Sequence, residues 1–263
     1  MRQSTPGHWE RYWDDVSRTG TGLDPYPNHQ RVVAACRALR QLQGARVLEV
    51  GAGSGLAAIE LAHAGAQVTV LDYVESSLSV VARHASGSGA SLHLVLGDAL
   101  AMPFPTGSFD VVMHQGLLEH FRNPRDLLAE NFRVLRPGGR VVVDVPQRWH
   151  VYTPVKRTLI AMDRWFAGWE TSYTIGELVA ELSEVGFVEE SRFGDWMSPS
   201  FGYRALRKTL AGVGPVLPSE PPRVESLRSA RRGLRRRLRR SPLSFYTYAN
   251  IGVVGRKPVV GPG

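Results

Sequence analysis

The feature that most constrains the fold is an alternation of apolar runs and helical patterns between residues 45 and 145. Short runs rich in valine and leucine are typical of buried strands, and the segments between them carry apolar residues at helical spacing. The runs cover residues 45–50, 67–71, 92–96, 109–113 and 140–145. Strands that alternate with helices in this way predict an α/β fold, in which helices cover both faces of a parallel sheet.

A glycine-rich stretch, GAGSG at residues 51–55, joins the first predicted strand to the first predicted helix. Glycine lets the backbone turn tightly and approach a ligand, because no Cβ stands in the way. A dinucleotide-binding fingerprint would need a glycine at position 56, where this chain has Leu56. Glu49 also places a negative charge beneath the loop, which favours a cationic ligand over a pyrophosphate.

Two further acids, Asp72 and Asp98, follow the second and third predicted strands. Because the carboxyl ends of parallel strands meet at one edge of the sheet, both acids are expected beside the glycine loop and Glu49. A carboxylate at Asp72 can accept hydrogen bonds from both hydroxyls of a ribose, and Asp98 can accept one from an adenine amino group. The sequence therefore predicts an adenosine-binding edge.

Taken together, these motifs resemble the class I S-adenosylmethionine-dependent methyltransferases, in particular the small-molecule branch called methyltransferase type 11. The stretches that carry the resemblance are LEVGAGSG (48–55), LDYVESSL (71–78), GDALAMPFPTGSFDVV (97–112), HQGLLEHF (114–121) and LRPGGRVVVDVP (135–146). The resemblance implies S-adenosyl-L-methionine as the cofactor. It also implies a Rossmann-like seven-stranded sheet, mostly parallel with an antiparallel last strand, helices on both faces and aromatic-rich cap insertions.

The resemblance also implies which residues bind the cofactor. Glu49 would lie near the charged methionine portion, Asp72 would take the ribose, and Tyr73 would flank the adenine. The expected cofactor contacts are Glu49, Gly51, Ala52, Gly53, Gly55, Asp72, Tyr73, Asp98, Ala99, His114 and Gln115.

The sequence constrains the catalytic group less than the cofactor contacts, because methyl transfer from a sulfonium is an in-line displacement with a good leaving group. The protein then mostly orients the reactants and supplies a base where one is needed. His120 and His114 are the candidate bases, since the pKa of histidine lies near neutrality. The alternative to a base role for His120 is a structural role. The histidines and the single cysteine show no spacing typical of metal ligands, so we expect no metal.

The chain divides into a cofactor-binding core and additions to it. In chain order we predict N-terminal cap helices (1–44), the core (45–145), a lid insertion (146–173), completion of the sheet (174–193 and 244–256) and, between those two, a basic insertion (194–243). Loops that leave parallel strands emerge on the ligand side, so both insertions should overhang the site. They hold four of the six tryptophans, which indicates either an aromatic-lined substrate pocket or the packing of a small helical subdomain.

The net charge of +8 comes from one segment, Arg223–Arg240, which holds nine arginines and one glutamate. The remaining chain is balanced, with 23 basic and 23 acidic residues. A helix over this segment would carry Leu227, Leu234 and Leu238 on one face. Three interpretations stay open: a solvated arm, docking on an anionic membrane surface, and neutralisation of RNA phosphates.

Composition limits the class of protein. Cys36 has no partner for a disulfide within the chain, the N-terminus lacks the apolar core of a signal peptide, and no apolar run reaches the roughly 18 residues of a spanning helix. We expect a cytoplasmic enzyme, peripheral to a membrane if the arginine segment docks there.

The expected reaction is methyl transfer from S-adenosyl-L-methionine to an O, N or C atom of a small aromatic or lipid-like molecule. The alternatives are an RNA methyltransferase or RNA binder that uses the arginine segment, and a non-catalytic cofactor-binding interaction domain.

Overall fold

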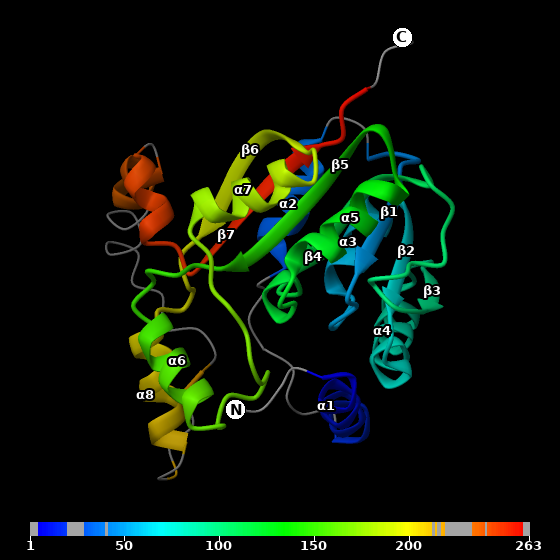
Figure 1. Cartoon of the computed structure of the whole chain (residues 1–263). Helices are drawn as coiled ribbons and strands as arrows, with labels where there is room; N and C mark the ends of the chain where they lie inside the picture. The colour runs from blue at the N-terminus through cyan, green and yellow to red at the C-terminus, as the bar shows by residue number, and fades with distance from the viewer. Residues whose placement is uncertain are drawn as a thin grey trace.

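The computed structural model describes residues 5–19, 29–39, 42–211, 214, 217–218, 233–239 and 241–259. Its centre is a seven-stranded sheet with the strand order β3-β2-β1-β4-β5-β7-β6 (Figure 1). The strands are β1 (Arg46–Val50), β2 (Gln67–Asp72), β3 (His93–Leu96), β4 (Phe109–Gln115), β5 (Leu135–Pro146), β6 (Val188–Asp195) and β7 (Asn250–Arg256). β7 pairs antiparallel with β5 and β6, while β1 to β5 pair in parallel. The predicted sheet with an antiparallel last strand is therefore confirmed.

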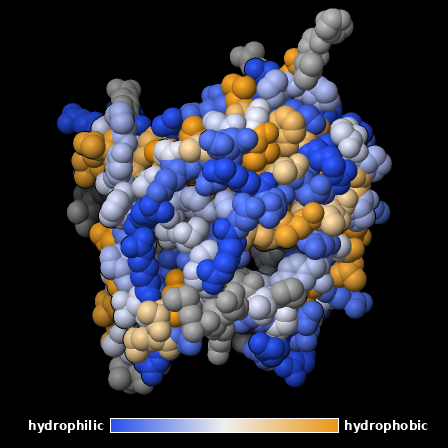
Figure 2. Space-filling model, in the orientation of Figure 1, coloured by the Kyte–Doolittle hydropathy of each residue, from blue (hydrophilic) through white to orange (hydrophobic). Residues whose placement is uncertain are grey.

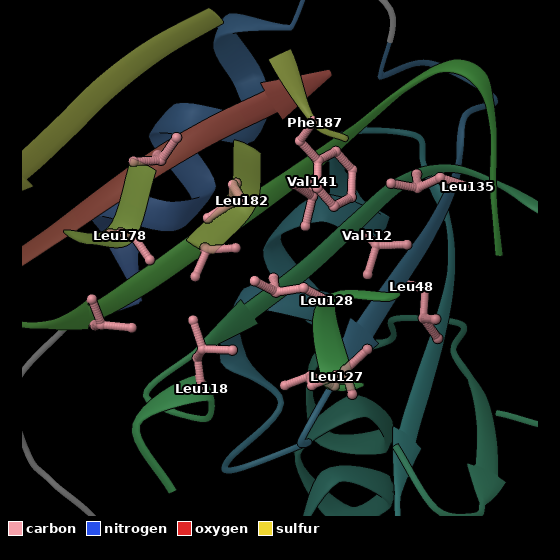
Figure 3. Packing of buried hydrophobic residues seen from close by; sticks show 14 of the residues in the cluster. Leu48, Val112, Leu118, Leu127, Leu128, Leu135, Val141, Leu178, Leu182 and Phe187 are labelled. Carbon is pink, nitrogen blue, oxygen red and sulfur yellow. The ribbon is translucent and has the colours of Figure 1, made fainter. Parts of the chain in front are cut away.

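Helices cover both faces of the sheet, and each face has its own apolar cluster. On one face α2 (Gln30–Ala38), α3 (Leu56–His63) and α4 (Glu75–Ser88) pack on the sheet. On the other face, α5 (Pro124–Val134) and α7 (Ile175–Glu184) insert leucines between strand valines, as Figure 3 shows. The strands are apolar on both faces because both are covered, which explains why they read as continuous apolar runs.

Two helix starts show how local sequence sets the boundaries. The residues Thr174 and Glu177 have the spacing typical of a capping box, and the structure contains one: the Thr174 hydroxyl accepts from the Glu177 backbone N–H at 3.2 Å. Asn123, by its residue type and its place before Pro124, is predicted to cap α5 with its side chain, but it does not. Its side-chain amide instead donates to Asp126 Oδ1 at 2.8 Å, and Pro124 begins the helix with its fixed φ.

The last predicted strand begins later than the sequence pattern suggested. Residues 242–246 form a short 3-10 helix, η2 (Pro242–Tyr246), and β7 follows from Asn250. Pro242 supplies the first position of this turn, and the Ser241 hydroxyl accepts from the Leu243 backbone N–H at 3.3 Å. A local cap therefore overrides the β-propensity of this aromatic segment.

The additions gather at the carboxyl edge of the sheet (Figure 1). The pairing of Asn250 with both Pro146 and Asp195 puts the ends of β5 and β6 at the same edge, so both insertions leave from it. They contain α6 (Thr153–Ala161) and α8 (Phe201–Ala211). Within the described ranges, the model contains no helix with both the length and the apolar character that a membrane crossing requires.

The N-terminal helix α1 (Pro6–Thr19) lies across this edge. Arg83 of α4 donates to the Ser17 carbonyl at 3.3 Å, which fixes one end of α1. Toward the other end, the Trp9 ring meets the His120 ring with their centroids 5.1 Å apart. The helix thus contacts both the core and the segment that follows β4.

Candidate functional site

The three glycines of the loop after β1 have positive φ angles of 77°, 49° and 70°, a backbone region that favours glycine. Their surroundings differ. A Cβ at Gly55 would lie 2.6 Å from Val81 Cγ1, and one at Gly51 would lie 3.2 Å from Leu117 Cδ1. A Cβ at Gly53 would meet no protein atom within 4 Å. Gly55 and Gly51 therefore permit packing, whereas Gly53 leaves the loop open to a ligand.

Asp72 organises the glycine loop. Its Oδ2 accepts from the Ala52 backbone N–H at 2.9 Å and from the Ser77 hydroxyl at 3.1 Å, and its Oδ1 accepts from the Val74 N–H at 2.8 Å. Burial raises the pKa of Asp72, although these hydrogen bonds oppose the shift. The carboxylate thus ties the loop to the turn before α4, a structural role that the sequence did not reveal. A ribose hydroxyl at this carboxylate would share it with Ser77.

Glu49 lies buried at the end of β1, under the start of α3. Its Oε2 accepts from the Ala58 backbone N–H at 3.1 Å, and burial raises its pKa to about 8. No salt bridge to Glu49 occurs among the described residues. A nearby cationic group would therefore stabilise the ionised carboxylate, as the amino group of a methionine portion would do.

Tyr73, Asp98 and Ala99 lie on the next strand ends. Tyr73 is half-buried, and burial raises the pKa of its hydroxyl, with further contributions from the charges of Asp72, Glu10 and Asp98. Asp98 is exposed and accepts from the Leu100 N–H at 2.8 Å. The two acids and the aromatic ring are thus neighbours at one edge. With the open Gly53 and the buried Glu49, they fit the parts of S-adenosyl-L-methionine: adenine, ribose and charged methionine portion.

His114 does not fit its predicted place. It has no exposed surface, and its Nε2 lies 3.0 Å from the Asn131 side-chain amide of α5. Burial lowers its pKa to about 3, so the ring is neutral. Side chains alternate along β4, and this alternation turns His114 into the core under α5. The His114 side chain therefore lies in the core, which disfavours it as a base. Contact of His114 with the cofactor, like that of the half-buried Gln115 at the strand end, stays a prediction.

His120 lies where α1 and the lid meet. Its Nδ1 is 3.4 Å from the Trp169 carbonyl, and the Trp9 ring packs on it. Burial lowers its pKa, which keeps the ring neutral at pH 7. His120 is thus enclosed on the lid side of the segment after β4.

A buried charged cluster beside His120 was missed by the sequence reading. Glu119 is only 3% exposed, and it lies near Lys156 and Glu170 of the lid. Those two form an ion pair whose side chains are 5% and 6% exposed, and Glu170 also accepts from the Trp165 ring N–H at 2.9 Å. Burial, and then the charge of Glu170, raise the pKa of Glu119 well above its ordinary value. One signal was available: Lys156 is one of only three lysines in the chain, inside an aromatic segment.

A separate cleft of about 850 Å³ opens between α2 and β6. None of the predicted site residues lines it. The arginines on its walls are paired with carboxylates, such as Arg140 with Glu190 at 2.8 Å and Arg239 with Asp195 at 3.1 Å. This cleft is therefore not the adenosine-binding edge.

Comparison with known proteins gives concordant matches. Residues 48–143 match the family described as "Methyltransferase domain". A demethylmenaquinone methyltransferase of Clavibacter sepedonicus is 37% identical over 142 residues, which are 52% of this chain and 58% of that protein. One of Tropheryma whipplei (strain Twist) is 32% identical over 197 residues, which are 68% of this chain and 80% of that protein.

A solved structure extends the likeness to nearly the whole chain. Phosphoethanolamine N-methyltransferase 2 of Haemonchus contortus, in complex with S-adenosyl-L-methionine, superposes with a TM-score of 0.60 at 17% identity. The alignment covers 94% of this chain and 56% of that one. At this identity the likeness shows the fold alone.

Proposed function

Since the chain belongs to the class I S-adenosyl-L-methionine-dependent methyltransferases, we propose that it methylates a small aromatic, lipid-like acceptor of the quinone class. The observation that carries the cofactor half of this proposal is the meeting of Glu49, Asp72 and the open Gly53 at one edge. When bound, the cofactor supplies an electrophilic methyl group on a positively charged sulfur. The protein's part is to hold it: Asp72 takes hydroxyls, and Glu49 faces the amino group.

Calorimetric titration tests the cofactor half. We expect wild-type protein to bind S-adenosyl-L-methionine and its demethylated product, and Asp72→Ala to weaken both about 10- to 100-fold, because charge-assisted hydrogen bonds are lost. Asp126→Ala is the matched control, since that acid contacts Asn123 on the surface of α5. Circular dichroism checks that each variant is folded. A folded wild-type protein that binds neither ligand would overturn the proposal and favour a domain that has lost its cofactor.

The acceptor class is supported by the aromatic lining of the lid side. Tyr12 of α1 lies 5.8 Å from Phe166, and Tyr152 lies 6.0 Å from Trp165, measured between ring centroids. Flat apolar acceptors pack well against such rings. The two bacterial relatives are named for demethylmenaquinone, a quinone. We expect the protein to transfer labelled methyl to demethylmenaquinone and not to polar amines such as ethanolamine. The reverse preference would reject the quinone class.

We further propose that the acceptor is met at an anionic membrane surface. The described part of the arginine segment, residues 233–239, is docked on the body of the protein. The Arg239 guanidinium contacts Asp195 at 3.1 Å, and Arg235 lies 5.3 Å from the centroid of the Trp196 ring. Arg236 and Arg237 are exposed there. Leu227, expected on the same helix face, lies outside the described residues.

Exposed apolar side chains flank these arginines. They are Leu234, Leu238, Leu243, Tyr246 and Trp149. The Gln147 amide donates to the Phe245 carbonyl at 2.9 Å, which brings η2 beside the start of the lid. Figure 2 shows apolar side chains along the left margin of the molecule, the side on which residues 233–239 lie in Figure 1. Apolar groups next to cations favour a lipid surface over RNA, which offers phosphates without an apolar layer.

Vesicle sedimentation distinguishes a lipid surface from RNA as the partner of the arginine segment. Wild-type protein should bind phosphatidylglycerol vesicles more strongly than phosphatidylcholine vesicles, and Leu243→Ser/Trp149→Ser should weaken binding about as much as Arg236→Gln/Arg237→Gln. Val188→Ser, an exposed apolar position on β6, is the control. Binding to tRNA that only the arginine variant weakens, without vesicle binding, would favour the RNA alternative instead.

A further inference from the structure

We propose that Glu119 is a catalytic residue whose carboxyl group binds a hydroxyl group of the acceptor and takes up its proton during methyl transfer. This inference rests on the proposed function and adds to it a substrate class, aromatic acceptors that carry a hydroxyl, and a proton acceptor.

The position of Glu119 is the first ground. It lies in a 3-10 turn, η1 (Leu118–His120), that follows β4 at the carboxyl edge of the sheet. The preceding residue, Leu117, packs against the glycine loop where a Cβ at Gly51 would be 3.2 Å away. The Glu119 carbonyl accepts from the Thr171 backbone N–H of the lid at 2.9 Å. Glu119 therefore stands between the cofactor loop and the lid.

The second ground is an unmet hydrogen bond. Glu119 is 3% exposed, yet its Oε2 has no hydrogen-bond partner among the described residues. Leaving a buried carboxyl oxygen without a partner costs free energy. Other buried side-chain atoms of the described residues, such as His114 Nδ1, also lack a hydrogen-bond partner, but Glu119 Oε2 is the one carboxyl oxygen among them. A donor from a bound molecule, such as a hydroxyl, would satisfy this oxygen.

The surrounding charges form the third ground. Lys156 and Glu170 neutralise each other, and Arg31 donates to both oxygens of Asp144 at 2.6 and 2.8 Å. His120 is neutral, and the other neighbour, Tyr173, is a phenol whose pKa is raised by burial. Glu119 is thus the carboxyl of this group without a cation of its own in the described part of the chain. A positive charge brought by a ligand would favour its carboxylate form.

This arrangement matches the charge change of the reaction. A positively charged sulfur bound near Glu119 would favour its ionised form, which can accept a proton. After loss of the methyl group that positive charge would be gone, and the protonated carboxyl would again be the stable form. Proton uptake by Glu119 therefore accompanies the step in which the sulfur becomes neutral.

The atoms balance as follows for transfer to the hydroxyl oxygen. The hydroxyl proton moves to the Glu119 carboxylate, and the oxygen forms a bond to the methyl carbon. The bond between sulfur and that carbon breaks, and its electron pair stays on the sulfur. The products are a methyl ether, a neutral thioether and a protonated Glu119, which loses its proton when the next S-adenosyl-L-methionine binds.

Calorimetry in buffers of different ionisation enthalpy tests the inference without turnover. Binding S-adenosyl-L-methionine to wild-type protein should release more protons than binding its demethylated product, because only the former brings the sulfur charge. The contribution of Glu49 cancels, since both ligands carry the same amino group. In Glu119→Gln the difference should vanish while both affinities stay within about threefold. A difference that persists in this variant would overturn the proposal.

Kinetics with an acceptor that presents a free aromatic hydroxyl, such as a catechol, form the second arm. Glu119→Gln should lower kcat about 100-fold or more, with KM for the cofactor unchanged, as expected for loss of a general base. The rise of the wild-type rate with pH should disappear. If Glu119→Gln does not fold, Glu119→Asp replaces it in the test. This variant keeps the carboxyl group, so it should still release the additional protons when S-adenosyl-L-methionine binds. A kcat of Glu119→Gln within threefold of wild type, with an unchanged pH profile, would reject the role of Glu119 and leave the methyltransferase assignment standing. If the wild-type protein did not bind the cofactor, the assignment itself would be rejected.

Discussion

The proposed site has a cofactor half around Asp72 and an acceptor half around Glu119, and the two hold their carboxyl groups in opposite ways. In the cofactor half, Asp72 accepts hydrogen bonds from Ala52, Val74 and Ser77, so the protein itself satisfies it. In the acceptor half, Glu119 keeps an oxygen without a partner in the described residues, next to a buried ion pair. The first half is preformed, whereas in the second half a bound acceptor would supply the missing hydrogen-bond donor. A rigid cofactor site and an acceptor site that its substrate completes can therefore coexist at one edge of the sheet.

The largest effect is expected in the acceptor half. Lys156→Met should lower the free energy of unfolding by about 3–5 kcal/mol, because it leaves the buried Glu170 without its cation. The double variant Lys156→Met/Glu170→Leu should regain most of this loss, since the charge is gone. Urea unfolding followed by circular dichroism measures both. If the double variant is as unstable as the single one, packing rather than charge holds the lid.

The cofactor half should respond according to which glycine is changed. Gly55→Ala should cost about 2–4 kcal/mol of stability, because the new Cβ would meet Val81 at 2.6 Å in addition to the strain of a positive φ. Gly53→Ala should cost about 1–2 kcal/mol for the φ alone and still weaken cofactor binding. Thermal unfolding and calorimetric titration distinguish the two. Equal losses of stability would contradict the view that Gly55 is packed and Gly53 is open.

Per pH unit, the smallest effect is a change of stability that originates at Glu49. Its pKa is near 4.5 in an unfolded chain and about 8 in the folded protein. Between these values the folded state keeps a proton that the unfolded state has lost, so this contribution is fully present below pH 4.5 and is lost as the pH rises through 8. The slope reaches at most about 1.4 kcal/mol per pH unit. Glu49→Gln keeps an oxygen for Ala58, and its stability should depend less on pH; identical profiles would contradict the shift.

The sequence was sufficient to place the predicted cofactor residues at one edge of the sheet, because each lies at or just after the end of a parallel strand. The glycine loop, Asp72 and Asp98 each follow a strand directly, and parallel strands bring their ends together without further information. The acceptor half could not be derived in this way. Glu119, Lys156 and Glu170 come from a turn, a helix and a loop spread over some fifty residues, and only tertiary packing joins them.

The orientation of the His114 ring could not be predicted for a narrower reason. The predicted strand ended at residue 113, whereas β4 includes His114, and the side to which its ring turns depends on the register with β5 and on Asn131 of α5. Shifting by a single residue along a strand exchanges the two faces. The 3-10 turn at Pro242 shows the same limit, since a cap of one serine outweighs the strand propensity of several aromatic residues.

The position of α1 has a kinetic consequence. Arg83 of the cofactor half holds Ser17, while Trp9 and Tyr12 rest on His120 and Phe166 of the acceptor half. A displacement of this helix would therefore break contacts with both halves at once, and access to the proposed cofactor and acceptor sites would then be coupled.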